Sequence, residues 1–420
     1  MKFFLIGIKG SGMAALASLL DDQGYEVSGS DVFHKCLTDE KLLERGIHIY
    51  KLDDKEYLKY DVIVVGHDFY KESLINELKE NKKIYFEYHK FLSFYLDNSK
   101  LISICGSHGK TTLVNLFSLL DNSYSYLRGD GEGKMVDYSE FFFLESCEYK
   151  NHFLEYHPQE IIITNIDYDH VDFFKSKKEY EIAFNLFSNN SKKVYISYKD
   201  RKKIKHNNII TFGKSKKANY YYEILEEDTE FLYVSFFKKK ELIIDLQIKN
   251  YGENFITLIT SLIAFLCEHD LSKIGLENKL KKYQPASQRF EEINIKENIV
   301  ILDYAHHPKQ IENNYQIVSK KYKNNIKIAI FRGDRFSRIS YFKKEIMKAL
   351  YKYDYAYVLP LPNMEENVGK DSKILVDRKI KYIDNIEELK LEKFSNKKYS
   401  ISLMSSKPFS YEIEYLNKLF

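Results

Sequence analysis

The hydrophobic and polar positions of the chain repeat one pattern: a short apolar run, a glycine-containing turn, and then apolar residues at helical spacing. The run Lys2–Ile8 predicts a strand, and Ser11–Gln23 predicts the helix after it. The same order recurs at Leu101–Cys105, with a helix from about Lys110. Strands that alternate with helices are typical of parallel sheets covered by helices, so we expect an α/β protein. Further strands are expected at Glu26–Ser28, Val62–Val65, Phe141–Leu144, Ile161–Asn165 and Lys193–Ile196.

The pattern changes between Tyr220 and Ile248. Three apolar runs there, YYYEILEE, FLYVSFF and ELIIDLQI, are separated by short charged stretches. Successive strands joined by short polar turns predict an antiparallel patch attached to the central α/β unit. A helix is expected at Asn254–His269, and Pro285 then interrupts the chain.

After Pro285 the alternation of strands and helices resumes and continues to the end of the sequence. Strands are expected at Asn298–Asp303 and Ile326–Phe331, with helices at Pro308–Lys321 and Tyr341–Lys352. We therefore expect three domains: a Rossmann-like domain over residues 1–98, a P-loop α/β domain with the antiparallel patch over 99–285, and a second Rossmann-like domain over 286–420.

Composition narrows the class of protein. The 420 residues carry 64 Lys and Arg against 61 Asp and Glu, a net charge of +3, which argues against a protein that coats nucleic acid or anionic membrane. The longest apolar stretch, Thr257–Cys267, is about half a membrane span, so no membrane insertion is expected. The apolar run at the start of the sequence is interpreted as a strand and not as an export signal, and the four cysteines are far apart, so a reducing cytoplasm is expected.

The strongest local motif is ICGSHGKTT, from Ile104 to Thr112, where a strand ends in a glycine turn and a helix follows. Backbone N–H groups in such a turn, together with the helix dipole, bind phosphate oxygens. Lys110 is then expected against the β- and γ-phosphates, and Thr111 offers a hydroxyl to Mg²⁺. The first glycine of the full P-loop pattern is missing, because Ile104 occupies its position.

A second glycine turn, Gly7-x-x-Gly10-x-Gly12-Met13, follows the first strand, and Asp31 follows the second. Such a turn can bind a pyrophosphate, with an acidic residue near a ribose. The spacing differs from GxGxxG, and a structural turn is an alternative. An NAD(P) dehydrogenase is a further alternative, although it leaves the glycine motif at Ile104–Thr112 unexplained.

Acidic and histidine residues follow two more predicted strands. Glu145 and Glu148 come after Phe141–Leu144, and His170 closes the segment TNIDYDH. Open α/β sheets bind their ligands at these strand ends. Carboxylates suit Mg²⁺, and a histidine ligand is less usual. Each residue has a surface position as its alternative.

Two motifs of the third unit contain candidate binding residues. In DYAHHP, adjacent His306 and His307 rarely converge on one ion, so nucleotide or substrate contacts are preferred over a metal pair. In FRGDRFSR, Arg335 and Arg338 lie three residues apart and can share one helix face. Two guanidinium groups suit a carboxylate or phosphate, and exposed arginines are the alternative.

These motifs occur in an order that resembles the Mur ligase family over almost the whole chain, and in particular its Gram-positive members that join L-alanine to UDP-N-acetylmuramate. The matching text is GIKGSGMAALA, SGSD, GSHGKTT, RGDGEG, ESCEYKNHFLEYHP, TNIDYDHVDFF, QRFEE, DYAHHP and FSR. The resemblance implies a three-domain, ATP- and Mg²⁺-dependent ligase of peptidoglycan and cell wall synthesis, a monomer or homodimer, that works through an acyl phosphate.

The resemblance also implies roles for individual residues. It implies UDP-sugar contacts from Gly7, Gly10, Ser11, Gly12, Met13 and Asp31. It implies ATP contacts from Gly106, Ser107, His108, Gly109, Lys110, Thr111, Thr112, Asn165, Asn254, Arg289 and Asp303. It implies magnesium ligands at Thr111, Glu145 and His170, and substrate contacts from Tyr304, His307, Arg335 and Arg338. It implies catalytic roles for Lys110, Glu145, His170, His306, Arg335 and Arg338.

Several stretches depart from the family pattern. The adenine stretch reads YGENFITL, the FQPH stretch reads FRGD with Asp334 in place of a histidine, and MSSKP replaces a glycine-rich segment near the C-terminus. Two alternatives remain open. One is a family ligase with a different amino acid or peptide acceptor, and the other is a nucleotide-binding regulatory or scaffold protein that has lost turnover.

Overall fold

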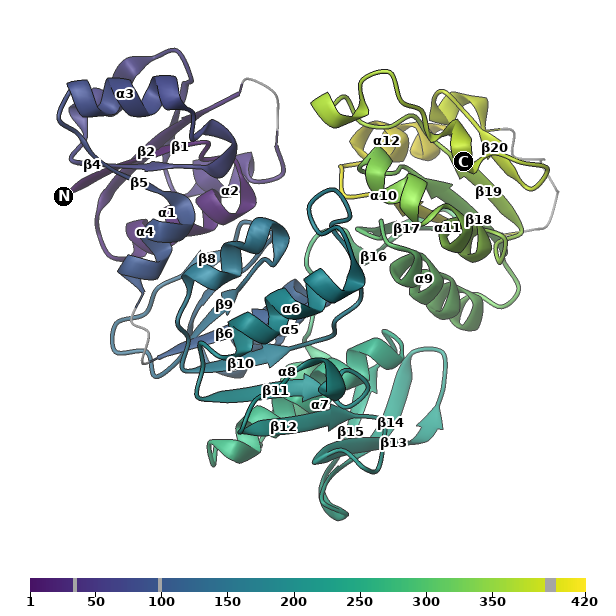
Figure 1. Cartoon of the computed structure of the whole chain (residues 1–420). Helices are drawn as coiled ribbons and strands as arrows, with labels where there is room; N and C mark the ends of the chain where they lie inside the picture. The colour runs from purple at the N-terminus through teal and green to yellow at the C-terminus, as the bar shows by residue number, and fades with distance from the viewer. Residues whose placement is uncertain (33–35, 97–99, 390–397) are drawn as a thin grey trace.

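The structure, a computed structural model, describes residues 1–32, 36–96, 100–389 and 398–420, and the strands of these residues form three sheets. Each sheet belongs to one lobe, and in Figure 1 the purple first lobe and the green to yellow third lobe lie above the teal central lobe. The predicted three-part α/β architecture is confirmed. The predicted boundary between residues 98 and 99 lies outside the described residues, and both domain boundaries stay predictions.

The first sheet is parallel throughout. Its lobe contains β1 (Lys2–Ile6), α1 (Ser11–Asp22), β2 (Glu26–Asp31), α2 (Asp39–Glu44), β3 (His48–Lys51), η1 (Lys55–Lys59), β4 (Val62–Val65), η2 (His67–Phe69), α3 (Glu72–Glu80), β5 (Ile84–Glu87) and α4 (Tyr88–Tyr95). The strand order is β3-β2-β1-β4-β5. Phe3 and Leu5 of β1 enter the core on one face and Phe4 and Ile6 the core on the other, as a doubly covered strand requires.

The central sheet is parallel around β6 and antiparallel at both ends. Its lobe contains β6 (Leu101–Cys105), α5 (Lys110–Leu120), β7 (Ser125–Leu127), β8 (Gly133–Lys134), β9 (Phe142–Glu145), η3 (Tyr149–Glu155), β10 (Glu160–Ile163), α6 (Lys177–Ser188), β11 (Lys193–Ser197), η4 (Arg201–Lys203), β12 (Ile209–Gly213), β13 (Tyr220–Glu227), β14 (Phe231–Lys238), β15 (Glu241–Lys249), α7 (Glu253–Glu268) and α8 (Leu276–Lys281). The order is β15-β14-β13-β12-β11-β10-β6-β9-β7-β8, so the predicted antiparallel patch is confirmed as β13–β15. The carboxyl ends of neighbouring β10, β6 and β9 therefore meet at one edge.

The third sheet is parallel except for β16 at its edge. Its lobe contains β16 (Arg289–Ile295), β17 (Asn298–Asp303), α9 (Pro308–Lys321), β18 (Ile326–Phe331), α10 (Phe336–Tyr341), α11 (Lys343–Leu350), β19 (Tyr355–Val358), η5 (Glu365–Asn367), η6 (Ser372–Leu375), β20 (Ile380–Tyr382), η7 (Ile386–Glu388), β21 (Tyr399–Met404) and α12 (Ser410–Leu419). The order is β16-β17-β21-β18-β19-β20. The predicted helix Tyr341–Lys352 is corrected: α10 ends at Tyr341 and α11 begins at Lys343.

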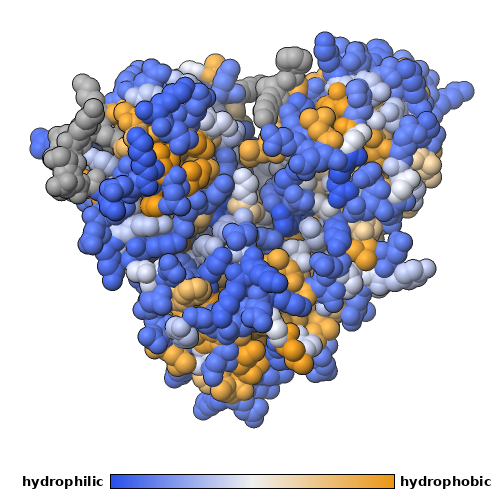
Figure 2. Space-filling view, turned by 180° about the vertical axis from the view of Figure 1, so that it is seen from behind, coloured by the Kyte–Doolittle hydropathy of each residue, from blue (hydrophilic) through white to orange (hydrophobic). Residues whose placement is uncertain are grey.

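The first and central lobes pack closely through α1 and β8. A Cβ atom on Gly133 of β8 would lie 2.2 Å from the carbonyl oxygen of Ala15 in α1, so a larger residue at position 133 would push the two elements apart. Figure 2, seen from behind, shows a mostly hydrophilic surface that is hollowed between the first and third lobes, above the central one.

Candidate active site

The glycine turn after β6 is built for a close approach of backbone to ligand. Gly106 has φ +129°, and a Cβ atom there would lie 2.2 Å from Thr164 Oγ1. Gly109 has φ +83° and precedes Lys110, the first residue of α5. Only glycine adopts such backbone angles at little cost, so the turn leads closely into the start of α5, where a helix N-terminus attracts phosphate oxygens. These observations fit the binding of a nucleoside triphosphate at the predicted P-loop.

Lys110 is held beneath this turn by a buried carboxylate. Its Nζ donates to the Gly106 carbonyl oxygen at 2.5 Å and to Glu148 Oε2 at 2.9 Å. Glu148 has no exposed side-chain area, and it also accepts a hydrogen bond from the Tyr180 hydroxyl at 3.1 Å. Burial opposes ionisation of Glu148, but Lys110 and His170 outweigh it and lower the pKa of this carboxyl to about 2. The lysine and the glutamate are therefore both charged at neutral pH.

Of the three predicted magnesium ligands, Thr111 and Glu145 contact each other, whereas His170 contacts Glu148. Thr111 Oγ1 donates to Glu145 Oε1 at 3.0 Å, and the Gly129 N–H donates to Glu145 Oε2 at 2.6 Å. His170 instead lies beside Glu148, with Nε2 at 3.6 Å from Oε1. His170 has φ +51°, and its buried Nδ1 has no hydrogen-bond partner among the described residues. A strained histidine that faces the buried Glu148 carboxylate through Nε2, and whose Nδ1 is unpaired among the described residues, fits a divalent cation.

A cavity of about 660 Å³ lies between the central and third lobes, next to the P-loop. Its lining combines tyrosine rings with amide, carboxylate and ammonium groups, a mixture that suits a nucleoside. Seven predicted ATP-binding residues line it: His108, Gly109, Thr112, Asn165, Asn254, Arg289 and Asp303. Sequence reasoning missed other lining residues, among them Tyr198, Lys214, Tyr222, Tyr251 and Tyr283, because no motif marks them.

Asp303, at the end of β17, faces this cavity from the third lobe. Asn314 Nδ2 donates to its Oδ2 at 2.7 Å, and burial raises the pKa of the carboxyl to about 6. Arg289 lies 4.1 Å above the Tyr304 ring. Asn254 Nδ2 donates to Asn313 Oδ1 at 3.2 Å, which joins the central lobe to α9.

The two adjacent histidines of DYAHHP point to different partners. His306 Nδ1 lies 2.9 Å from the Tyr304 carbonyl oxygen, whereas His307 Nε2 lies 3.3 Å from the Tyr168 carbonyl oxygen. The His307 ring lies 4.7 Å from that of His108 in the P-loop, and burial lowers the pKa of both groups. His306 and His307 therefore point to different backbone carbonyls, and their predicted nucleotide or substrate contacts stay a prediction.

The two predicted arginines form ion pairs with the central lobe. Arg335 donates to Asp172 Oδ2 at 2.7 Å and to the Tyr149 hydroxyl at 2.9 Å. Arg338 Nε donates to Asp169 Oδ1 at 2.8 Å, and Arg338 Nη1 donates to Asp334 at 3.2 Å.

Asp169 and Asp172 are functional candidates that sequence reasoning missed. Both residues could have been found from the sequence, because they lie in the segment TNIDYDHVDFF that follows β10. Each carboxylate pairs with a guanidinium of the third lobe, so these contacts join the two lobes over the site.

The glycine loop of the first lobe is also tightly constrained. Gly7 has φ +86°, and a Cβ atom there would lie 2.6 Å from the Phe69 ring. Gly12 approaches Tyr88 so closely that a Cβ atom would lie 2.5 Å from its hydroxyl. Asp31 accepts hydrogen bonds from the N–H groups of Lys9 and Val32, each at 2.7 Å.

The remaining predicted sugar contacts surround the start of α1. Gly10 is its N-cap, Ser11 its first residue, and Met13 is buried. Because Asp31 accepts hydrogen bonds from the N–H groups of Lys9 and Val32, it orders the backbone of this glycine loop, and its place near the nucleotide stays a prediction.

Comparisons with known proteins agree with this arrangement. The catalytic domain of the Mur ligase family matches residues 2–98, and the Mur ligase middle domain matches residues 133–264. A UDP-N-acetylmuramate–L-alanine ligase of Lacticaseibacillus casei is 30% identical over 377 residues, which cover 88% of this chain and 86% of the relative.

Solved structures show the same fold. The UDP-N-acetylmuramate–alanine ligase of Thermotoga maritima is 19% identical with a TM-score of 0.81, and the match covers 100% of both chains. A murein peptide ligase of Psychrobacter arcticus is 16% identical with a TM-score of 0.71 over 100% of this chain and 98% of that one. Among the described residues, no helix is long and apolar enough to cross a membrane. The family domains, the extended sequence identity and the arrangement of the site together establish that this chain belongs to the Mur ligase family.

Proposed function

We propose that this chain uses ATP to join L-alanine to the lactyl carboxylate of UDP-N-acetylmuramate, in peptidoglycan precursor synthesis. The observation that carries the proposal is that the cavity of about 660 Å³ is lined by P-loop residues and lies next to Lys110, which is paired with Glu148. The 30% identity to the ligase of L. casei, over 88% of the chain, supports the choice of substrates.

The residues of the site have separate tasks in this reaction. A lactyl carboxylate oxygen attacks the γ-phosphorus of ATP and ADP leaves, and Lys110 neutralises phosphate charge because two negatively charged groups must approach each other. Asp303, Asn254 and Arg289 hold the nucleoside in the cavity. Glu148 keeps Lys110 charged and oriented. The resulting acyl phosphate would hydrolyse in water, so the contacts between the central and third lobes protect it.

A magnesium ion fits the carboxylate, hydroxyl and imidazole groups beside the P-loop. Thr111, Glu145 and His170 are its proposed ligands, and Glu148 borders them. The ion would supply positive charge at the phosphate oxygens. Arg335 and Arg338 are the proposed partners of the amino-acid carboxylate, which would compete with Asp172 and Asp169 for them. We further propose a cytoplasmic location, domain boundaries after residues 98 and 285, and a monomer or homodimer.

One observation favours a second candidate, a family ligase for a different amino acid. Asp334 stands where the family pattern has a histidine, and it pairs with Arg338 at 3.2 Å. This carboxylate changes the charge beside the proposed amino-acid site.

Phosphate release distinguishes these functions. It is measured with MgATP and UDP-N-acetylmuramate, with and without L-alanine, glycine or L-serine. Release that requires both the sugar and L-alanine supports the proposal. Release with another amine keeps the ligase and changes its substrate, whereas ATP binding without release under any condition favours a regulatory protein.

A further inference from the structure

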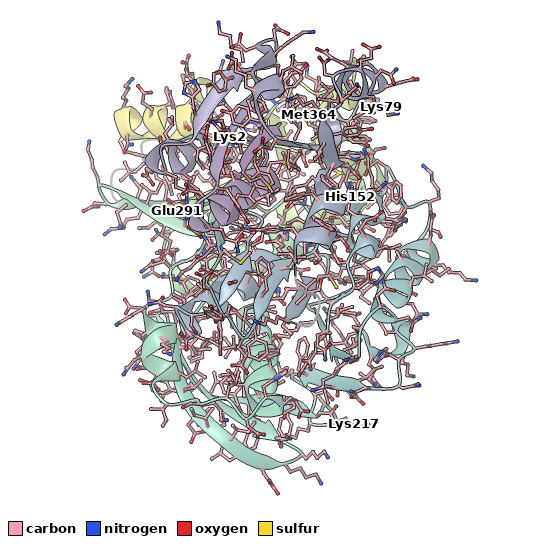
Figure 3. All side chains as sticks on the ribbon, turned by 90° about the vertical axis from the view of Figure 1, so that its left-hand side faces the viewer. Lys2, Lys79, His152, Lys217, Glu291 and Met364 are labelled. Carbon is pink, nitrogen blue, oxygen red and sulfur yellow. The ribbon has the colours of Figure 1, made fainter. Side chains whose placement is uncertain are left out.

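A cluster of three imidazoles and one carboxylate lies where the first lobe meets the central lobe. His67 starts η2 and is separated from β4 by Gly66, Glu87 ends β5, and His89 is the second residue of α4. His152 comes from η3 of the central lobe, and Figure 3 labels it at the border between the two lobes. The proposed function uses none of these four residues.

The spacing of the cluster suits one small cation. One ligand atom each from His67, Glu87 and His152 lies within 4.8 Å of the others. His67 Nδ1 and Glu87 Oε1 are 3.1 Å apart. Two ligands of a tetrahedral zinc ion with bonds of about 2.0–2.1 Å are roughly 3.3 Å apart, so this pair already has nearly the separation that such an ion needs.

The central lobe holds His152 in place by an unusual backbone path. Lys150 and Asn151 both have positive φ angles, +52° and +62°, which is a strained conformation for residues other than glycine. The His89 ring stacks on the His152 ring at 4.0 Å, and Tyr156 lies 2.7 Å from His89 Nδ1. Within the described residues, the ring nitrogens of His152 have no hydrogen-bond partner, so this imidazole, packed against His89, is available to bind a ligand.

We propose that His67, Glu87 and His152 bind one divalent transition-metal cation, of which Zn²⁺ is the best match. Two imidazoles and one carboxylate are borderline ligands that suit zinc better than magnesium or calcium. A fourth position then remains for water. Because the site takes ligands from both lobes at the carboxyl ends of β4 and β5, the cation fixes the angle between the first sheet and the central lobe.

Lys150 is the competitor that the cation must displace. Its Nζ lies 3.0 Å from His67 Nε2, so in the absence of metal the ring accepts from Lys150 and donates from Nδ1 to Glu87. When Nδ1 binds a metal, the proton moves to Nε2, and the ammonium group loses its acceptor and turns away. The net number of protons on His67 is unchanged. Removing the Lys150 charge should therefore strengthen metal binding.

The test is a Co²⁺ titration of the full chain, followed by visible absorption, because tetrahedral Co²⁺ absorbs strongly and replaces Zn²⁺. Excess Mg²⁺ is present throughout to occupy the oxygen-rich ligands near the P-loop. We expect tetrahedral bands that Zn²⁺ abolishes. His67→Asn and His152→Gln should weaken binding at least tenfold, and Lys150→Met should tighten it. His157→Gln is the matched control, since His157 is exposed in the loop directly after η3.

Thermal unfolding gives a second readout that does not depend on turnover. Zn²⁺ should raise the Tm of the wild-type chain and of His157→Gln, and it should leave His152→Gln unchanged. Glu87→Gln keeps a hydrogen-bond partner for His67, so this variant should fold and should bind Co²⁺ with an affinity between those of the wild type and His67→Asn. An intermediate affinity would show that the loss of binding in the histidine variants does not come from unfolding. Equal Co²⁺ affinity in His67→Asn, His152→Gln and His157→Gln would overturn the proposal.

Discussion

Lys110 Nζ lies 2.9 Å from Glu148 Oε2, so the lysine of the P-loop is paired with a carboxylate that is fully buried. Such a pair fixes the ammonium group for phosphate, but it makes the two residues depend on each other for stability. Removing one partner of a buried pair leaves an uncompensated charge and typically costs about 3–5 kcal/mol.

Lys110→Met is expected to reduce turnover about a thousandfold, since phosphate charge would be left without its cation. It should also lower the Tm, because Glu148 loses its partner. The double variant Lys110→Met/Glu148→Gln should recover the Tm and remain inactive. The measurement pairs phosphate release with thermal unfolding, and Lys90→Ala, an exposed lysine, is the control. An active double variant would remove Lys110 from the site.

His170→Ala is expected to raise the Mg²⁺ concentration needed for half-maximal activity at least tenfold. The reason is the strained backbone of His170, the position of its Nε2 beside Glu148, and its buried Nδ1, which has no hydrogen-bond partner in the part of the chain that the structure describes. The measurement is a Mg²⁺ titration of phosphate release at saturating ATP, with His157→Ala as the control. A titration that matches the wild type would exclude His170 as a metal ligand.

Arg335→Ala is expected to raise the KM for the amino acid at least tenfold and to leave the KM for ATP within about twofold. The reason is that Arg335 is the proposed charge-assisted hydrogen-bond donor to the carboxylate of the amino-acid substrate. Steady-state kinetics with each substrate varied in turn checks this. Arg378→Ala removes an exposed arginine from the same lobe and serves as the control. If the KM for ATP changes instead, Arg335 acts on the nucleotide.

The pH dependence of ATP binding should follow Asp303. Burial raises the pKa of its carboxyl to about 6, so the group is ionised above that pH and, as a proposed ATP ligand, would accept hydrogen bonds from ribose hydroxyls. Protonation at lower pH makes the carboxyl a weaker acceptor, and the KM for ATP should rise by up to about tenfold at one unit below the pKa. Asp303→Asn should give a raised KM that no longer changes between pH 5 and pH 7 (roughly the range around that pKa). The same pH dependence in the variant would point to another group.

The sequence predicted the buried strands best, because a strand covered on both faces is a continuous apolar run. Lys193–Ile196 and Ile326–Phe331 differ from β11 and β18 by at most one residue. The break between Tyr341 and Lys343 was missed, since the apolar spacing continues through Phe342 and gives no sign that the backbone changes direction there.

The structure places the P-loop and Asp303 at the ends of β6 and β17, where parallel sheets bind their ligands. Asn254 and Arg289, which only the family resemblance suggested, line the same cavity as Asp303, and the binding roles of these residues stay predictions. The pairs Arg335–Asp172 and Arg338–Asp169 could not be foreseen, because they join segments more than 160 residues apart in separate lobes. The cluster of His67, Glu87 and His152 escaped notice for the same reason.

The short segment from Cys147 to His152 has a consequence for inhibitor design. Tyr149 contacts Arg335 of the third lobe, and the ring of His152 meets that of His67 in the first. A compound that displaces this segment would remove contacts to both neighbouring lobes at once, whereas a compound in the cavity between the central and third lobes would leave the contact of His152 with His67 in place.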